Sequence, residues 1–142
     1  MNATNDTIAI SLETARLLAL AIRTLARECE RTVDPAPSMV ALAALETGAA
    51  QALALAKAHV DEPGGEAIEA AGVELSDALS MLARDFRDGT VRWSSVRVLE
   101  DFVSLYIPRG RVRTLLENAI DVAVVAAHTI KQRSEQLAGL CY

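Results

Sequence analysis

The sequence is poor in the residues that build disulfide scaffolds and metal sites. Its two cysteines, Cys29 and Cys141, form no Cys-x-x-Cys pair, and their spacing predicts neither a disulfide framework nor a zinc site. Its two histidines, His59 and His128, have no Glu or Asp three residues before them, which is the spacing that metal sites in helical bundles use. We therefore predict no metal and no cofactor, a buried role for Cys29 and surface positions for both histidines.

Motifs that carry enzyme chemistry are also missing. The chain contains no HExxH, no GxSxG and no glycine-rich phosphate loop, and its Gly64-Gly65 pair lacks a following Lys-Ser or Lys-Thr. We predict from these absences that the protein is not an enzyme.

Net positive charge and long apolar runs are lacking as well. The formal net charge is −5, so no overall positive field attracts nucleic acid or an acidic membrane. Uncharged stretches are far shorter than the roughly 20 residues of a membrane span, and residues 1–6 contain no basic signal region. We expect a soluble, cytoplasmic protein with no membrane partner.

What the sequence does contain is alanine and branched aliphatic residues. Hydrophobic residues make up 51% of the chain and aromatics only 4%, which favours closely packed helices because alanine loses no side-chain entropy in a helix. No alternating β-branched run is flanked by hairpin residues. The composition predicts an all-α fold, a single domain spanning 1–142.

The spacing of apolar residues at three and four predicts five helices, four long and one short. These cover about Thr7 or Ser11 to Thr32, Met39 to His59, Glu66 to Arg87, Ser95 to Tyr106 and Arg109 to Leu137. Short connections predict antiparallel neighbours in a helical bundle, with residues 1–7 and 138–142 frayed.

Turn and cap residues mark the helix boundaries. Asp34 or Ser38 is expected to cap the second helix and Ser94 the fourth. Gly89 suits a left-handed stop after the third helix, and Pro108 forces a corner before the fifth. Trp93 and Val98 stand at the positions of a hydrophobic staple around Ser94.

The second helix is apolar on nearly every side. Such a helix is either central in its domain or covered by a partner chain. The small residues Ala44, Gly48 and Ala52 form a seam that permits close helix contact, and Val122 and Val125 add apolar surface beside the core stripe of the fifth helix. We predict a homodimer that uses these five residues, with a compact monomer built around the second helix as the alternative.

Charge is distributed unevenly along the chain. Residues 84–113 carry seven arginines, whereas residues 61–77 carry six acids and no base. This asymmetry predicts a surface for a second subunit or another charged protein. The arginines proposed for it are Arg92, Arg97, Arg109, Arg111 and Arg113.

Two other functions remain open at this point. Residues 96–116 resemble a helix-turn-helix, in which Arg109, Arg111 and Arg113 would meet the major groove of DNA. Tyr106 and Phe102 stand where that motif usually has small residues, so nucleic-acid binding is the weaker hypothesis. The third hypothesis is a hydrophobic small molecule bound in an alanine-lined core.

Overall fold

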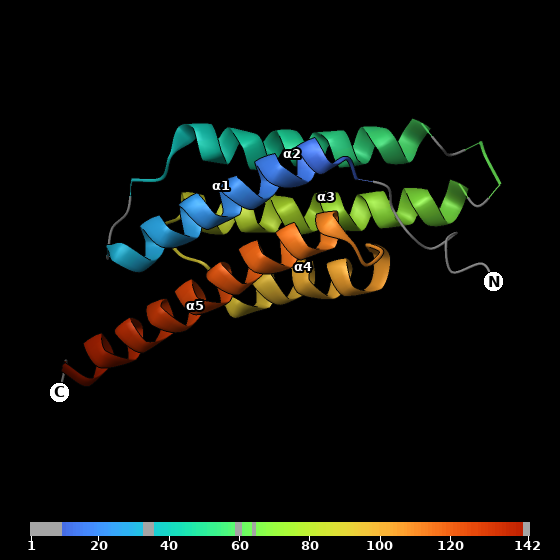
Figure 1. Ribbon diagram of the computed structural model, residues 1–142. Coiled ribbons are helices and arrows are strands. Elements are labelled where there is room, and N and C mark those ends of the chain that lie inside the picture. The colour runs from blue at the N-terminus through green and yellow to red at the C-terminus, as the bar shows by residue number, and fades with distance from the viewer. Residues whose placement is uncertain (1–9, 33–35, 59–60, 64, 141–142) are drawn as a thin grey trace.

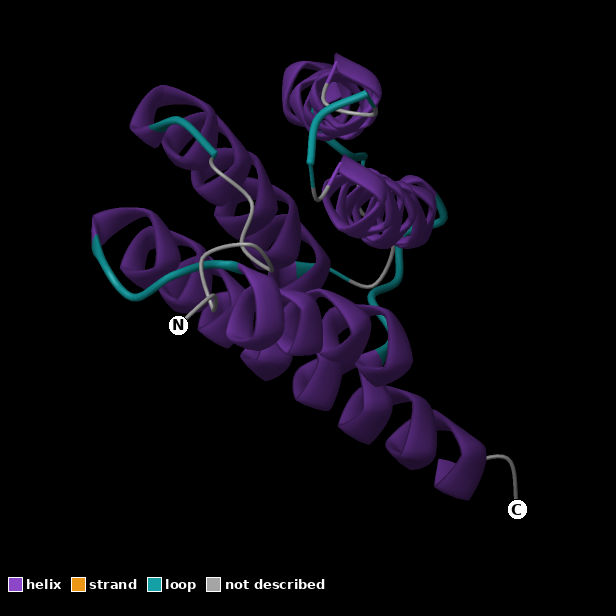
Figure 2. Cartoon of the chain, turned by 90° about the vertical axis from the view of Figure 1, so that its right-hand side faces the viewer, coloured by secondary structure: helices purple, strands orange, loops and turns teal. Residues whose placement is uncertain are grey.

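The computed structural model describes residues 10–32, 36–58, 61–63 and 65–140, and within them it is all-α, with five helices and no strand (Figures 1 and 2). The helices are α1 (Leu12–Arg31), α2 (Met39–Ala58), α3 (Gly65–Arg87), α4 (Trp93–Tyr106) and α5 (Arg111–Leu140). The predicted fold class is therefore confirmed. Residues 1–7, 141 and 142 lie outside the described residues, and α5 extends beyond its predicted end at Leu137 to Leu140.

Side-chain caps begin α1 and α2, and the cap at Ser38 was predicted. The Ser11 side chain accepts a hydrogen bond from the Thr14 N–H at 3.1 Å and begins α1. The Ser38 hydroxyl accepts one from the Ala41 N–H at 3.2 Å and begins α2. Each cap satisfies a backbone donor that has no partner inside its helix. The other candidate cap, Asp34, lies outside the described residues.

The turn between α3 and α4 follows a different plan from the predicted one. Gly89 ends α3 in the left-handed conformation (φ 75°), as predicted. The fourth helix, however, begins at Trp93 with Arg92 at the cap position, so the predicted Ser94 cap and its staple are wrong. The Asp85 carboxylate instead accepts the backbone N–H of Arg92, the residue before the helix, at 3.0 Å.

Sequential helices run antiparallel, as predicted. An ion pair joins Glu46 near the start of α2 to Arg87 at the end of α3. At the other side, α1 and α5 run parallel, and they form one of the two most extensive helix contacts (Figure 1). Arg133 of α5 reaches the end of α1 and donates to the carbonyl oxygens of Glu30 at 2.6 Å and Thr32 at 3.1 Å.

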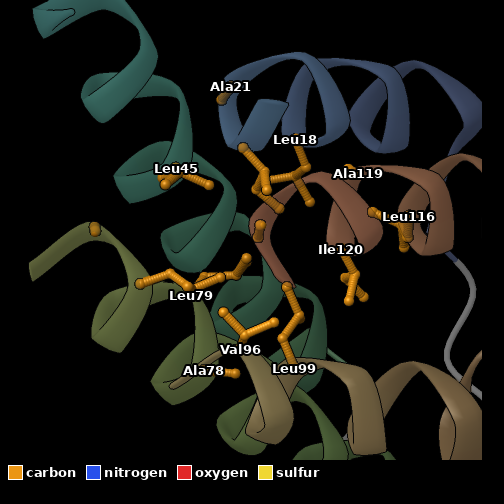
Figure 3. Packing of buried hydrophobic residues seen from close by; sticks show 14 of the residues in the cluster. Leu18, Ala21, Leu45, Ala78, Leu79, Val96, Leu99, Leu116, Ala119 and Ile120 are labelled. Carbon is orange, nitrogen blue, oxygen red and sulfur yellow. The ribbon is translucent and has the colours of Figure 1, made fainter. Parts of the chain in front are cut away.

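The core lies between α1, α3, α4 and α5, and α2 covers one edge of it (Figure 3). Leu18, Leu79, Leu99 and Ile120 point toward one another from these four helices. Alanines fill much of the remaining space, which allows the helix axes to approach closely. Phe86 is the bulkiest fully buried side chain.

The alternative prediction, a compact monomer built around α2, does not agree with the position of this helix. This helix packs extensively against α3, less against α1, and makes no comparable contact with α4 or α5. Figure 1 shows it along one edge of the bundle. A helix that is apolar on nearly every side therefore lies at the periphery of the chain, with one side toward solvent.

Candidate functional site

The exposed side of α2 carries an uncharged stripe from Val40 to Ala54, with Glu46 beside it and Lys57 beyond its end. This outer face of α2 repeats at steps of three and four, so its residues lie in one line. Its residues are Val40, Ala43, Thr47, Ala50 and Ala54, all exposed. Val40 is 83% exposed and the neighbouring Met39 is 71% exposed. A peripheral helix normally presents charged residues here, so this face is unusual for a surface in contact with water.

The small-residue seam predicted on α2 lies on the opposite side of the helix. A Cβ atom added to Gly48 would stand 2.3 Å from Leu18 Cδ2, so the glycine permits contact with α1 of the same chain. Ala52 is buried and Ala44 is half-buried. The tight packing predicted at Gly48 is confirmed, and the structure places that packing within the chain.

The two valines proposed on α5 differ in exposure. Val125 is more than half exposed, whereas Val122 is half-buried and packs against the core. On α1, Leu17 and Leu20 are also more than half exposed, and Leu18 between them contacts Gly48 of α2. Exposed apolar side chains therefore occur on α1 and α5 as well as on α2.

Sequence reasoning overlooked the outer face of α2, although its signal was present. Positions 40, 43, 47, 50 and 54 already form an uncharged helical stripe in the sequence. The seam that contains Ala44 is as apolar as the outer face of α2. Only the position of α1 shows which of the two is covered. Local periodicity identifies faces of a helix but does not say which one meets the core.

The five arginines proposed as a partner surface do not form one patch. Arg92 and Arg97 lie at the beginning of α4, whereas Arg109, Arg111 and Arg113 follow its end. Arg97 stands nine residues before the end of α4, about 14 Å along the helix axis, so α4 separates the two groups.

Two of these arginines are committed to contacts within the chain. Arg92 donates from Nη2 to the buried Asp85 carboxylate at 2.9 Å, and this contact raises the pKa of its guanidinium above the usual value. Arg113 donates to Glu117 at 3.4 Å and to the Ile107 carbonyl oxygen at 3.5 Å.

The helix-turn-helix hypothesis gains little from this geometry. Behind the exposed Arg109 and Arg111, the solvent side of α5 carries Glu117 and Asp121. Carboxylates on a recognition helix would repel the phosphates that supply most of the affinity for DNA. The remaining length of α5 packs against α1 and α4.

A groove between α3 and α4 combines carboxylates with apolar side chains. The pocket here has a volume of about 380 Å³. The residues that line this acidic groove are Glu74, Asp77, Val98, Asp101, Phe102, Leu105 and Tyr106. Leu105 is 69% exposed, and the Phe102 and Tyr106 rings lie 5.0 Å apart. Three acids and no base line the groove, which favours a cationic, partly apolar ligand.

A second pocket, of about 480 Å³, lies between the start of α4 and the second half of α5. The Trp93 and His128 rings are 5.5 Å apart at its wall. Its charged groups balance one another, since Arg92 pairs with Asp85 and Lys131 shares the wall with Glu135. The described pockets open at the surface, so the predicted ligand site inside the core has no observation in its favour.

No family model matches the chain, and neither a curated protein nor a solved structure is similar to it.

The remaining reactive side chains show no metal-binding arrangement in the described ranges. No three His, Cys, Asp or Glu residues among them come together around a common point. Cys29 is buried as predicted, and burial, aided by Glu28, raises the pKa of its thiol to about 11. His59 and Cys141 lie outside the described residues. None of the helices in the described part of the chain is long and apolar enough to cross a bilayer.

Proposed function

We propose that this protein acts by association with a second copy of itself through the outer face of α2. The proposal rests on the contrast between the apolar composition of α2 and its position at the edge of the bundle. Helix α2 has an uncharged stripe from Val40 to Ala54, yet it lies at the edge of the bundle with that stripe exposed. Burial of exposed apolar surface is the main favourable term in protein association.

The stripe suits a twofold contact. Thr47 is its midpoint, with Ala43 and Ala50 on either side and Val40 and Ala54 beyond them. Two copies related by a twofold axis near Thr47 would place their α2 helices antiparallel, with each half of one stripe against the opposite half of the other. Small side chains allow the axes to approach to about 8 Å.

The neighbouring Met39, 71% exposed, adds apolar surface at the start of the stripe. A contact between two single helices buries a smaller area than the roughly 1,200–2,000 Å² typical of stable interfaces. We therefore expect a dimer that dissociates at micromolar concentration.

Sedimentation velocity over a range of micromolar concentrations tests this proposal. The wild-type protein should shift from monomer to dimer, and Ala50→Glu should remain monomeric because it places a charge in the middle of the contact. Ala138→Glu is the matched control, since Ala138 is an exposed helical alanine on α5. The proposal fails if the wild type stays monomeric throughout, or if both variants dimerise like the wild type.

A further inference from the structure

We propose that the acidic groove between α3 and α4 binds a cationic amphipathic helix of another protein. The groove is separate from the outer face of α2, so this inference does not depend on the dimer. It rests on the charges of the groove, the exposure of its apolar residues and their spacing.

The charge of the groove is of one sign. Glu74 and Asp77 of α3 lie on one side, and Asp101 of α4 lies on the other. All three are exposed, and the residues that line the groove include no Lys, Arg or His. A ligand that carries Lys or Arg would meet opposite charges on both sides, whereas an acidic ligand would be repelled.

The apolar part of the groove has the length of a helix contact. Val98 and Leu105 are both exposed and stand two turns apart on α4, about 10 Å along the helix. Phe102, buried, lies between them in sequence and closes the floor together with Tyr106. A partner helix with large apolar residues one or two turns apart matches this strip.

The arrangement specifies the chemistry of the occupant. Leucine-sized side chains would contact Val98 and Leu105, and flanking lysines or arginines would pair with Glu74, Asp77 and Asp101. The pairs lie in solvent, where each contributes little by itself. Affinity therefore depends on apolar contact and charge together, and we expect dissociation constants in the micromolar range for so small a surface, on the order of 10 µM.

The probe is a helical peptide of about 18 residues, five turns, with a leucine face and lysine flanks. A second peptide with the same leucine face and glutamate flanks is its matched control. Titration of the full chain with each peptide, followed by backbone amide chemical shifts, measures both affinity and location. The lysine peptide should bind and perturb α3 and α4 amides around the groove, and the glutamate peptide should not.

Two variants with the same change in net charge separate the groove from the overall acidity of the protein. Glu74→Lys with Asp77→Lys should weaken the lysine peptide about tenfold, and Leu105→Ala should weaken it without altering charge. Glu13→Lys with Glu135→Lys changes exposed acids elsewhere and should leave binding unchanged.

Three results would overturn the inference. The first is equal loss of affinity in both charge variants, which would show non-specific attraction. The second is chemical-shift changes outside α3 and α4. The third is a different oligomeric state for Glu74→Lys with Asp77→Lys in the absence of peptide, which would assign the groove to a second copy of this chain. The Ala50→Glu variant, monomeric under the dimer proposal, should bind the lysine peptide like the wild type.

Discussion

Replacing Asp85 with alanine should cause a large loss of stability for a single substitution. Asp85 is only 1% exposed, although it carries a charge. Its carboxylate accepts the Arg92 backbone N–H at 3.0 Å, Arg92 Nη2 at 2.9 Å and Arg92 Nε at 3.3 Å. These bonds hold the turn that orients α4 against α3.

The size of the effect follows from these contacts. A hydrogen bond to a charged group contributes about 1.5–3 kcal/mol. Two of the three come from a guanidinium whose side chain is 63% exposed, and solvent screens their contribution. The cost of burying the carboxylate, which the substitution removes, opposes the loss. We expect Asp85→Ala to lower the free energy of unfolding by about 2–3 kcal/mol, out of a typical 5–15 kcal/mol.

Urea unfolding followed by helical circular dichroism measures this loss. All variants are compared at one protein concentration, because dimerisation would otherwise change the apparent stability. A urea dependence of about 1–3 kcal/mol per M converts the loss into a midpoint shift of about 0.7–3 M. Asp85→Asn keeps the shape of the side chain but places an amide donor against the N–H groups of Arg92. Its midpoint shift should therefore lie between zero and that of Asp85→Ala.

The matched control is Asp88→Ala, in the same turn and exposed. Its free energy of unfolding should change by less than about 0.5 kcal/mol, as for other surface substitutions. An Asp85→Ala shift no larger than that of Asp88→Ala would refute the role assigned to the buried carboxylate.

Three further predictions concern stability. Arg133→Met should cost about 1–2 kcal/mol because three carbonyl oxygens at the end of α1 lose their donor; an unchanged urea midpoint would contradict this. Gly48→Val should destabilise by about 2 kcal/mol through its clash with Leu18, and Leu18→Ala in the same chain should make the valine less costly, as a double-mutant cycle would show. The Cys29 thiol has a pKa of about 11 in the folded protein, against 9.0 for the unfolded chain. The stability that the protonated thiol contributes to the fold is therefore fully present below pH 9 and is lost as the pH rises toward 11. Cys29→Ala should therefore lose less stability than the wild type between pH 8 and pH 10.5, and equal losses would show that this thiol does not contribute.

Features that depend on neighbours in the sequence were predicted well. The five helices, the Ser38 cap, the stop at Gly89 and the burial of Cys29 all appear in the structure. Each follows from side-chain spacing or from a backbone group that a nearby residue satisfies. The Ser94 cap was the exception, because α4 begins at Trp93, before that residue, and the Asp85 carboxylate holds the Arg92 backbone N–H.

Features that depend on which faces meet were not predictable in this way. Helix α2 offers two small apolar stripes, and only its packing on Leu18 decides that Gly48 is covered and Ala50 exposed. The arginine-rich segment is continuous in sequence, yet a rigid helix divides it into two groups. The acidic groove likewise exists only because the antiparallel turn of α3 and α4 brings Glu74 beside Leu105.

The sequence by itself determined the helices and the high content of apolar residues. The tertiary structure decided where those residues lie, since long-range packing selects one of several equivalent faces on each helix. Arg133 is the plainest case: it lies about a hundred residues after the carbonyl groups it caps, and no local pattern connects them.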